Sequence, residues 1–132
     1  MKGLQTAILA AMIIAAPATS QDIAEGERVF QHRCASCHGL DADGNGPMAP
    51  VLLLQPTDLT QLQRGNGDDF PLKKVVWRID GRDPLVSHGS PMPVYGDFFE
   101  GSDVTLQTAS GEAIMTSQPI ADLIAWIQSI QK

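Results

Sequence analysis

The stretch "RCASCHGLDADGNGPMAP", residues 33–50, decides the fold and contains two overlapping patterns. Its first half holds C-x-x-C-H, formed by Cys34, Cys37 and His38, which is the attachment pattern of c-type haem. Its second half reads D-x-D-x-N-G over residues 41–46 and is similar to the opening of a calcium-binding loop. The two patterns predict different chemistry, and the rest of the chain has to decide between them.

The spacing of the cysteines has a mechanical reason. Two thiols three residues apart on a helical turn can reach the two vinyl groups of one haem, and thioether bonds then fix the ring. His38 follows at once and is predicted to bind the iron as the proximal ligand. A structural zinc needs four ligands, and only His32 and His88 remain, with no second C-x-x-C. A redox-active dithiol is typical of a βαβ setting, whereas this region has a helical pattern, so haem is favoured.

The calcium pattern is incomplete. An EF-hand loop places a bidentate glutamate at its twelfth position, and Leu52 stands there. The alternative is a polar turn, in which Asp and Asn supply local hydrogen bonds and the glycines permit positive φ. We expect residues 39–55 to form such a loop beside the cysteine motif.

The N-terminus, residues 1–20, is typical of a secretory signal peptide. It has a charged start at Lys2, a short apolar run, and small residues that offer cleavage near Ala18 or Ser20. The run is too short to span a bilayer, although a buried helix or an uncleaved anchor remains an alternative. We expect residues 21–132 to form one domain in the periplasm, without stable membrane insertion. In bacteria, covalent haem attachment takes place outside the cytoplasm, which agrees with export.

The composition is that of a globular protein, with 43% hydrophobic residues. Aromatic residues make up only 5%, so a bound cofactor is expected to supply apolar bulk. The formal net charge is −6, without a basic stripe, which argues against nucleic-acid binding. An acidic surface instead favours partners with basic docking patches.

Apolar spacing predicts mostly short helices separated by long loops rich in Gly and Pro. The expected helices cover residues 22–36, 69–81 and 117–131, and a short further helix is expected to start at 56–59 with Thr57 as N-cap. A small β-hairpin is expected near 104–115, around a turn at 109–111.

Two segments carry a resemblance to a known family. The first is Gly26-x-x-x-Phe30 followed by the cysteine motif, and the second is residues 120–127 near the C-terminus. Together they resemble the class I c-type cytochromes. The resemblance implies an all-α cytochrome c fold, with three to five short helices around one covalently bound haem c, and single-electron transfer without enzymatic activity. In that family a glycine meets an aromatic residue where the terminal helices cross, a role that fits Gly26 and Trp126.

The family resemblance also suggests ligands and supporting residues. Residues 89–96 resemble the methionine loop, which implies Met92 as the second axial ligand, a soft thioether that raises the potential. His88 is the rival and would give bis-His ligation. Gly46 and Pro47 resemble the family's Gly-Pro pair, whose proline carbonyl accepts a hydrogen bond from the proximal histidine.

Two weaker assignments concern the haem propionates. Trp77 is expected to contact a propionate through its indole N–H, and Arg82, or Arg78 near it, to pair with one. The alternative for each arginine is an ordinary surface position.

These features leave three functions open. The first is a periplasmic single-electron carrier with one His/Met-ligated haem c. The second is a haem subunit of a periplasmic oxidoreductase, with residues 96–116 as a docking element. The third is a haem enzyme with an open iron position, which requires that Met92 does not bind the iron.

Overall fold

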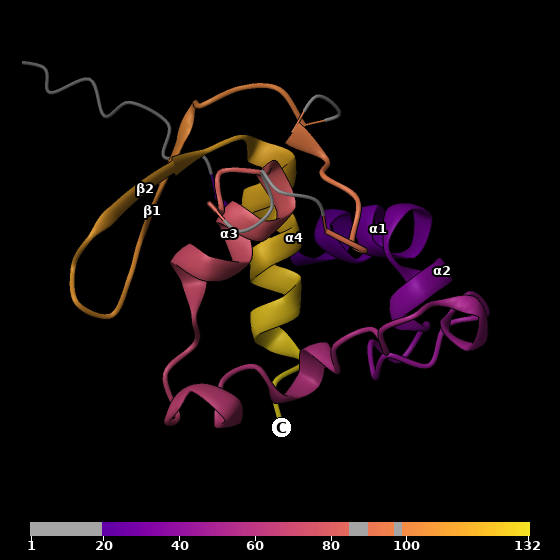
Figure 1. Cartoon of the computed structure of the whole chain (residues 1–132). Coiled ribbons are helices and arrows are strands. Elements are labelled where there is room, and N and C mark those ends of the chain that lie inside the picture. Colours follow the sequence, from indigo (N-terminus) through magenta and orange to yellow (C-terminus); the bar gives the residue numbers. More distant parts are fainter. Residues whose placement is uncertain (1–19, 85–89, 97–98) are drawn as a thin grey trace, which may run out of the picture.

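The structure, a computed structural model, describes residues 20–84, 90–96 and 99–132, and is mainly helical (Figure 1). Its α-helices and strands are α1 (Ile23–Arg33), α2 (Ala35–His38), α3 (Leu72–Asp80), β1 (Val104–Gln107), β2 (Ala113–Thr116) and α4 (Gln118–Ser129). Single turns of 3-10 helix lie in the long loop, namely η1 (Ala49–Val51), η2 (Leu59–Gln61) and η3 (Arg64–Asn66). The predicted helical fold with a small hairpin is confirmed.

The α1 and α4 helices cross in close contact and form the centre of the fold (Figure 1). At the crossing, a Cβ on Gly26 would lie 2.0 Å from the carbonyl oxygen of Asp122, so the two backbones touch. One turn further along α1, the ring of Phe30 packs on Trp126, with centroids 4.4 Å apart. At the crossing, Gly26 thus lies against the backbone of α4, and Trp126 packs on Phe30.

The β-hairpin closes one side of this core. Val104 pairs with Thr116 and Leu106 with Ile114, which puts the buried residues of both strands on one face. Its apolar side chains join the cluster formed by α1, α3 and α4. The hairpin therefore has a structural role in covering the core.

The chain between the helices differs from the sequence prediction in two places. The first helix does not run through to Ser36, because Cys37 N–H donates to Cys34 O at 3.1 Å, which breaks the helix at Cys34. The short helix expected to start at 56–59 is a single turn of 3-10 helix, Leu59–Gln61, with a different cap. Asp58, and not Thr57, caps a single turn there, because its carboxylate accepts from Thr60 N–H at 2.9 Å.

The third helix ends as predicted, at Gly81, whose φ of 85° few other residues adopt. Among the described residues, no helix is long and apolar enough to cross a membrane. The predicted signal peptide falls almost entirely on residues 1–19, which lie outside the described residues.

Candidate functional site

The cysteine motif lies at the junction of α1 and α2. Cys34 caps the end of α1 and Cys37 lies one turn later in α2, both as free, half-buried thiols. Burial, and then negative charge on Cys37, raises the pKa of the Cys34 thiol to about 11. A redox-active dithiol instead uses a thiolate of lowered pKa. Cys34 therefore lacks the lowered pKa that is typical of such a dithiol.

His38 is the last residue of α2, and its ring is buried, with 8% of its surface exposed. Its Nδ1 lies 2.9 Å from the carbonyl oxygen of Thr57. Burial lowers the pKa of His38, and the bond to Thr57 opposes this shift. A neutral ring that donates Nδ1–H to a carbonyl keeps its Nε2 lone pair for a metal.

The identity of this carbonyl corrects one sequence prediction. Pro47 was expected to accept the Nδ1–H bond, but Thr57 accepts it, and Pro47 is exposed. The reason lies in how the loop folds, because three of its amides bond to α2. The N–H groups of Gly44, Gly46 and Met48 donate to the carbonyl oxygens of His38, Cys37 and Ser36, at 2.8, 3.0 and 2.9 Å.

These bonds satisfy carbonyls at the end of a short helix, which have no partner within it. They also bring the loop so close that a Cβ on Gly46 would lie 2.6 Å from the carbonyl oxygen of Cys37. The glycine of the Gly-Pro pair therefore has a packing role beneath the cysteine motif.

The acidic half of the opening stretch forms a polar turn. The Asp43 carboxylate accepts from the backbone and side-chain N–H groups of Asn45, each at 3.0 Å. The Asn45 bonds, the side-chain bond first, lower the pKa of Asp43. Within the described residues no three His, Cys, Asp or Glu side chains gather as metal ligands. The bonds between Asp43 and Asn45 are those expected of a polar turn.

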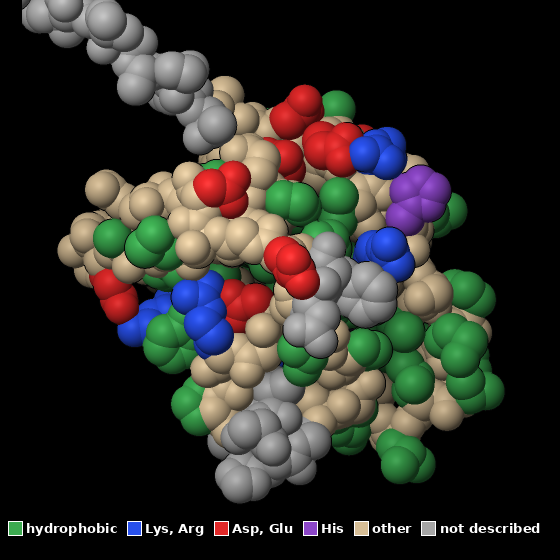
Figure 2. Space-filling view, turned by 90° about the horizontal axis from the view of Figure 1, so that it is seen from above, with side chains coloured by type: hydrophobic (Ala, Val, Ile, Leu, Met, Phe, Trp, Pro, Cys, Tyr) green, Lys and Arg blue, Asp and Glu red, His purple; other side chains and the backbone are tan. Residues whose placement is uncertain are grey.

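Beside the motif, the loop exposes an unusual number of large apolar side chains. They are Leu40, Met48, Val51, Leu53 and Leu54, which we term the apolar loop surface. Leu53 is fully exposed. Figure 2 shows hydrophobic side chains gathered at the end of the molecule where Figure 1 places α2 and the loop after it. An exposed patch of this kind usually serves binding, and a large apolar cofactor held by the adjacent cysteines fits it.

Met92 lies in the loop after α3, half-buried and packed against the core. Its amide donates to Ser90 Oγ at 3.2 Å. Tyr95 connects this loop to two helices, because its N–H donates to Ile79 O at 2.8 Å and its hydroxyl to Arg33 O at 2.9 Å. The loop of Met92 therefore reaches the end of α1, next to the first cysteine. The rival ligand, His88, lies outside the described residues.

The weaker site predictions have local partners in the structure. Lys73 Nζ lies 4.6 Å above the ring centre of Trp77. Arg82 pairs with Asp80 and donates to the carbonyl of Met115 in β2, at 2.9 Å. Arg78 forms an ion pair with Asp83 at 2.9 Å. Contacts of these residues with haem propionates stay predictions. His32, considered above as a zinc ligand, is exposed on α1.

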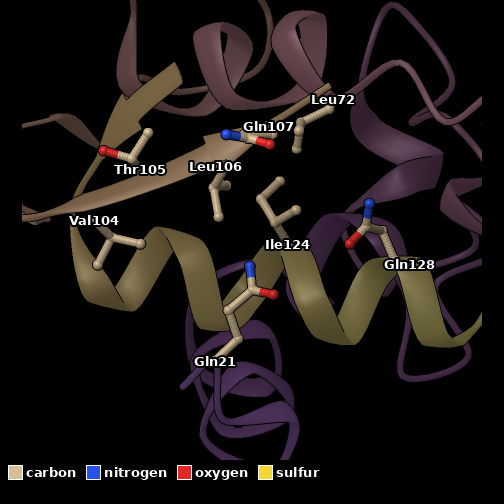
Figure 3. A pocket seen from close by; sticks show the side chains of 8 residues that line it. All are labelled: Gln21, Leu72, Val104, Thr105, Leu106, Gln107, Ile124 and Gln128. Carbon is tan, nitrogen blue, oxygen red and sulfur yellow. The ribbon is translucent and has the colours of Figure 1, made fainter. Parts of the chain in front are cut away.

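A separate hollow of about 310 Å³ lies between β1 and α4 (Figure 3). Its apolar floor includes Leu106 and Ile124, and glutamine side chains surround it. It contains no residue of the cysteine motif and no methionine, so it is distinct from the haem site.

Thr57 and Tyr95 are the two residues at the site that sequence reasoning missed. The Thr57 contribution is a backbone carbonyl, which leaves no trace in the residue type. The position of Tyr95, three residues after Met92 in the proposed ligand loop, is the only sequence signal that pointed to its role.

The cysteine pair, the buried histidine beside it and the nearby methionine loop define a small helical protein that attaches haem c. The model of the cytochrome c family matches residues 23–131, and the chain belongs to this family. Members bind covalently attached haem c, and the single C-x-x-C-H motif of this chain provides for one. No match was found among curated proteins or among solved structures.

Proposed function

We propose that this protein is a single-electron carrier of the periplasm, with one haem c bound by His38 and Met92, and not an enzyme. The observation that carries the proposal is the buried His38 ring, held by Thr57 O at 2.9 Å directly after two free cysteines. When bound, the haem would supply an iron that cycles between the ferric and ferrous states.

The residues of the motif divide the work of binding. Cys34 and Cys37 would hold the haem covalently, because each thiol would add across one vinyl group, with its sulfur bonding to one carbon and its proton passing to the other. His38 would bind the iron through Nε2, while the Thr57 carbonyl holds the imidazole in one orientation and raises its basicity. The side chains of the apolar loop surface carry no polar group and would help to exclude water from a haem bound beside them.

Met92 is the proposed second axial ligand. A neutral thioether favours the ferrous form and raises the reduction potential. With His38 and Met92 both bound, the iron would have no open position for a substrate, which supports a carrier over an enzyme.

The cellular setting is part of the same proposal. Residues 1–20 would direct export and be removed, leaving residues 21–132 as the mature domain. The full chain has a formal net charge of −6, and residues 1–20 contain only one charged side chain, Lys2, so the mature domain stays acidic and suits docking to basic patches on redox partners. Such encounters would be brief and use small interfaces.

A second candidate is a haem subunit of a periplasmic oxidoreductase. The exposure of the apolar loop surface favours it, because permanent interfaces are more hydrophobic than transient ones. Residues 96–116 are less suited to docking, since the hairpin within them packs on the core. Gel filtration of material from the native host separates the two, because a lone small species contradicts the subunit.

The spectrum of the ferric protein, taken with a potentiometric titration, tests the proposal. We expect a low-spin spectrum, a far-red sulfur-to-iron charge-transfer band that disappears in Met92→Ala, and a one-electron titration. A high-spin spectrum of the native protein would overturn the carrier and favour an enzyme with an open iron position.

A further inference from the structure

At the break between α1 and α2, the carbonyl oxygen of Arg33 accepts a hydrogen bond from the Tyr95 side chain, which comes from a distant loop. In an unbroken α-helix, Arg33 O would accept from the N–H of Cys37, four residues later. Here Cys37 donates to Cys34 O instead, at 3.1 Å. The Tyr95 hydroxyl donates to Arg33 O at 2.9 Å, so a residue 62 positions away completes the end of α1.

Tyr95 is itself fixed on the opposite side. Its N–H donates to Ile79 O at 2.8 Å, near the end of α3. Its ring lies 6.1 Å from that of Phe99, centre to centre. The neighbouring Gly96 packs closely on α3, because a Cβ there would lie 2.7 Å from Asp80 O. The tyrosine therefore bridges α3 and the cysteine-bearing end of α1.

Tyr95 is also close in sequence to Met92, the proposed iron ligand. Tyr95 is three residues after Met92, with only Pro93 and Val94 between them, and proline restricts the backbone. Burial, and then charge on Cys34 and Cys37, raises the pKa of the Tyr95 phenol, as expected for a group close to both cysteines. The hydroxyl thus joins the Met92 loop to the turn that carries the first thioether.

We infer that Tyr95 is a positioning residue that holds the Met92 loop against the cysteine turn and so sets how firmly Met92 stays on the iron. The inference rests on the proposed ligation of the iron by Met92. It adds that the Tyr95 hydrogen bond opposes dissociation of Met92 from the iron. Loss of the hydroxyl removes this hydrogen bond between the loop and α1, while the backbone bond from Tyr95 to Ile79 in α3 remains. The Met92-bound form then becomes less favoured relative to the open form.

Competition by imidazole for the ferric iron measures this equilibrium in the holoprotein. Tyr95→Phe keeps the ring and removes the hydrogen bond. Ser129→Ala is the matched control, because the Ser129 hydroxyl also donates to a backbone carbonyl, Trp126 O at 2.6 Å, in α4. We expect Tyr95→Phe to bind imidazole about two- to tenfold more tightly, the range for one net hydrogen bond, and Ser129→Ala to bind it as the native protein does.

Urea unfolding of both variants separates positioning from general destabilisation. A comparable loss of stability in the two, with tighter imidazole binding only in Tyr95→Phe, supports the inference. Unchanged imidazole affinity in Tyr95→Phe, or an equal rise in Ser129→Ala, overturns it and leaves Met92 ligation intact. If the native protein lacks the far-red band and binds imidazole as tightly as Met92→Ala does, the proposed ligation fails, and the inference fails with it.

Discussion

Replacing Gly26 by alanine is expected to destabilise the protein, although alanine favours a helix. The new Cβ would lie 2.0 Å from the carbonyl oxygen of Asp122 and 3.0 Å from Leu123 N. Both are main-chain atoms of α4, so no side-chain rotation relieves the contact. Tight but tolerated contacts begin at 3.0–3.4 Å, and the two helices must therefore separate by about 1 Å. This separation also loosens the packing of Phe30 on Trp126.

Two opposing effects determine the size of the loss. Overpacking against backbone costs up to ~3 kcal/mol, while alanine gains ~1 kcal/mol over glycine in a helix interior. We expect a net loss of about 2 kcal/mol in the free energy of unfolding. Urea unfolding of the holoprotein, followed by circular dichroism and by haem absorbance, measures it.

Gly65→Ala is the matched control. Gly65 lies in η3, and a Cβ there would meet no atom within 4 Å. We expect this variant to be as stable as the native protein or slightly more so. If Gly26→Ala proved as stable as Gly65→Ala, the close crossing of α1 and α4 would be refuted as the reason for the glycine.

The remaining predictions concern the loop beside the cysteine motif and the crossing of α1 and α4. Gly46→Ala should lower both the free energy of unfolding, by ~1–3 kcal/mol, and the yield of haem-stained protein, because its Cβ would lie 2.6 Å from Cys37 O; a normal yield would contradict the packing role. Neither calcium nor EDTA should shift the melting temperature, because the Asp43 carboxylate is satisfied within its own turn; stabilisation by calcium would revive the metal interpretation. Asp122→Ala should cost ~1–3 kcal/mol, and Asp122→Asn less, since the buried carboxylate accepts from the start of α1 and from Gln118; equal losses would show that its acceptor role is unimportant.

Sequence reasoning located the regular elements well where local rules decide them. The periodic apolar positions of α3 and α4 and the stop at Gly81 are local signals, and the hairpin has alternating residues around a turn. The end of the first helix was not predictable in the same way. Its break at Cys34 is stabilised by a tyrosine from the methionine loop, a contact that local propensity does not contain.

The residues of the site also differ in whether local sequence rules or the tertiary fold specify them. Cys34, Cys37 and His38 are specified by a spacing rule that reflects the dimensions of the haem. No such rule specifies the carbonyl that orients His38. Every residue carries the same backbone C=O group, and only the fold decides which of them reaches the histidine ring. The long loop folds back through three bonds to α2, and this places Thr57, and not Pro47, at the histidine ring.

The intact mass of the exported protein, measured under denaturing conditions, tests the central claim most directly. The account predicts a mature chain that carries the mass of one haem, which is lost in the Cys34→Ala, Cys37→Ala double variant. A denatured native chain with no added mass, or one in which the two cysteines form a disulfide, would contradict covalent haem attachment.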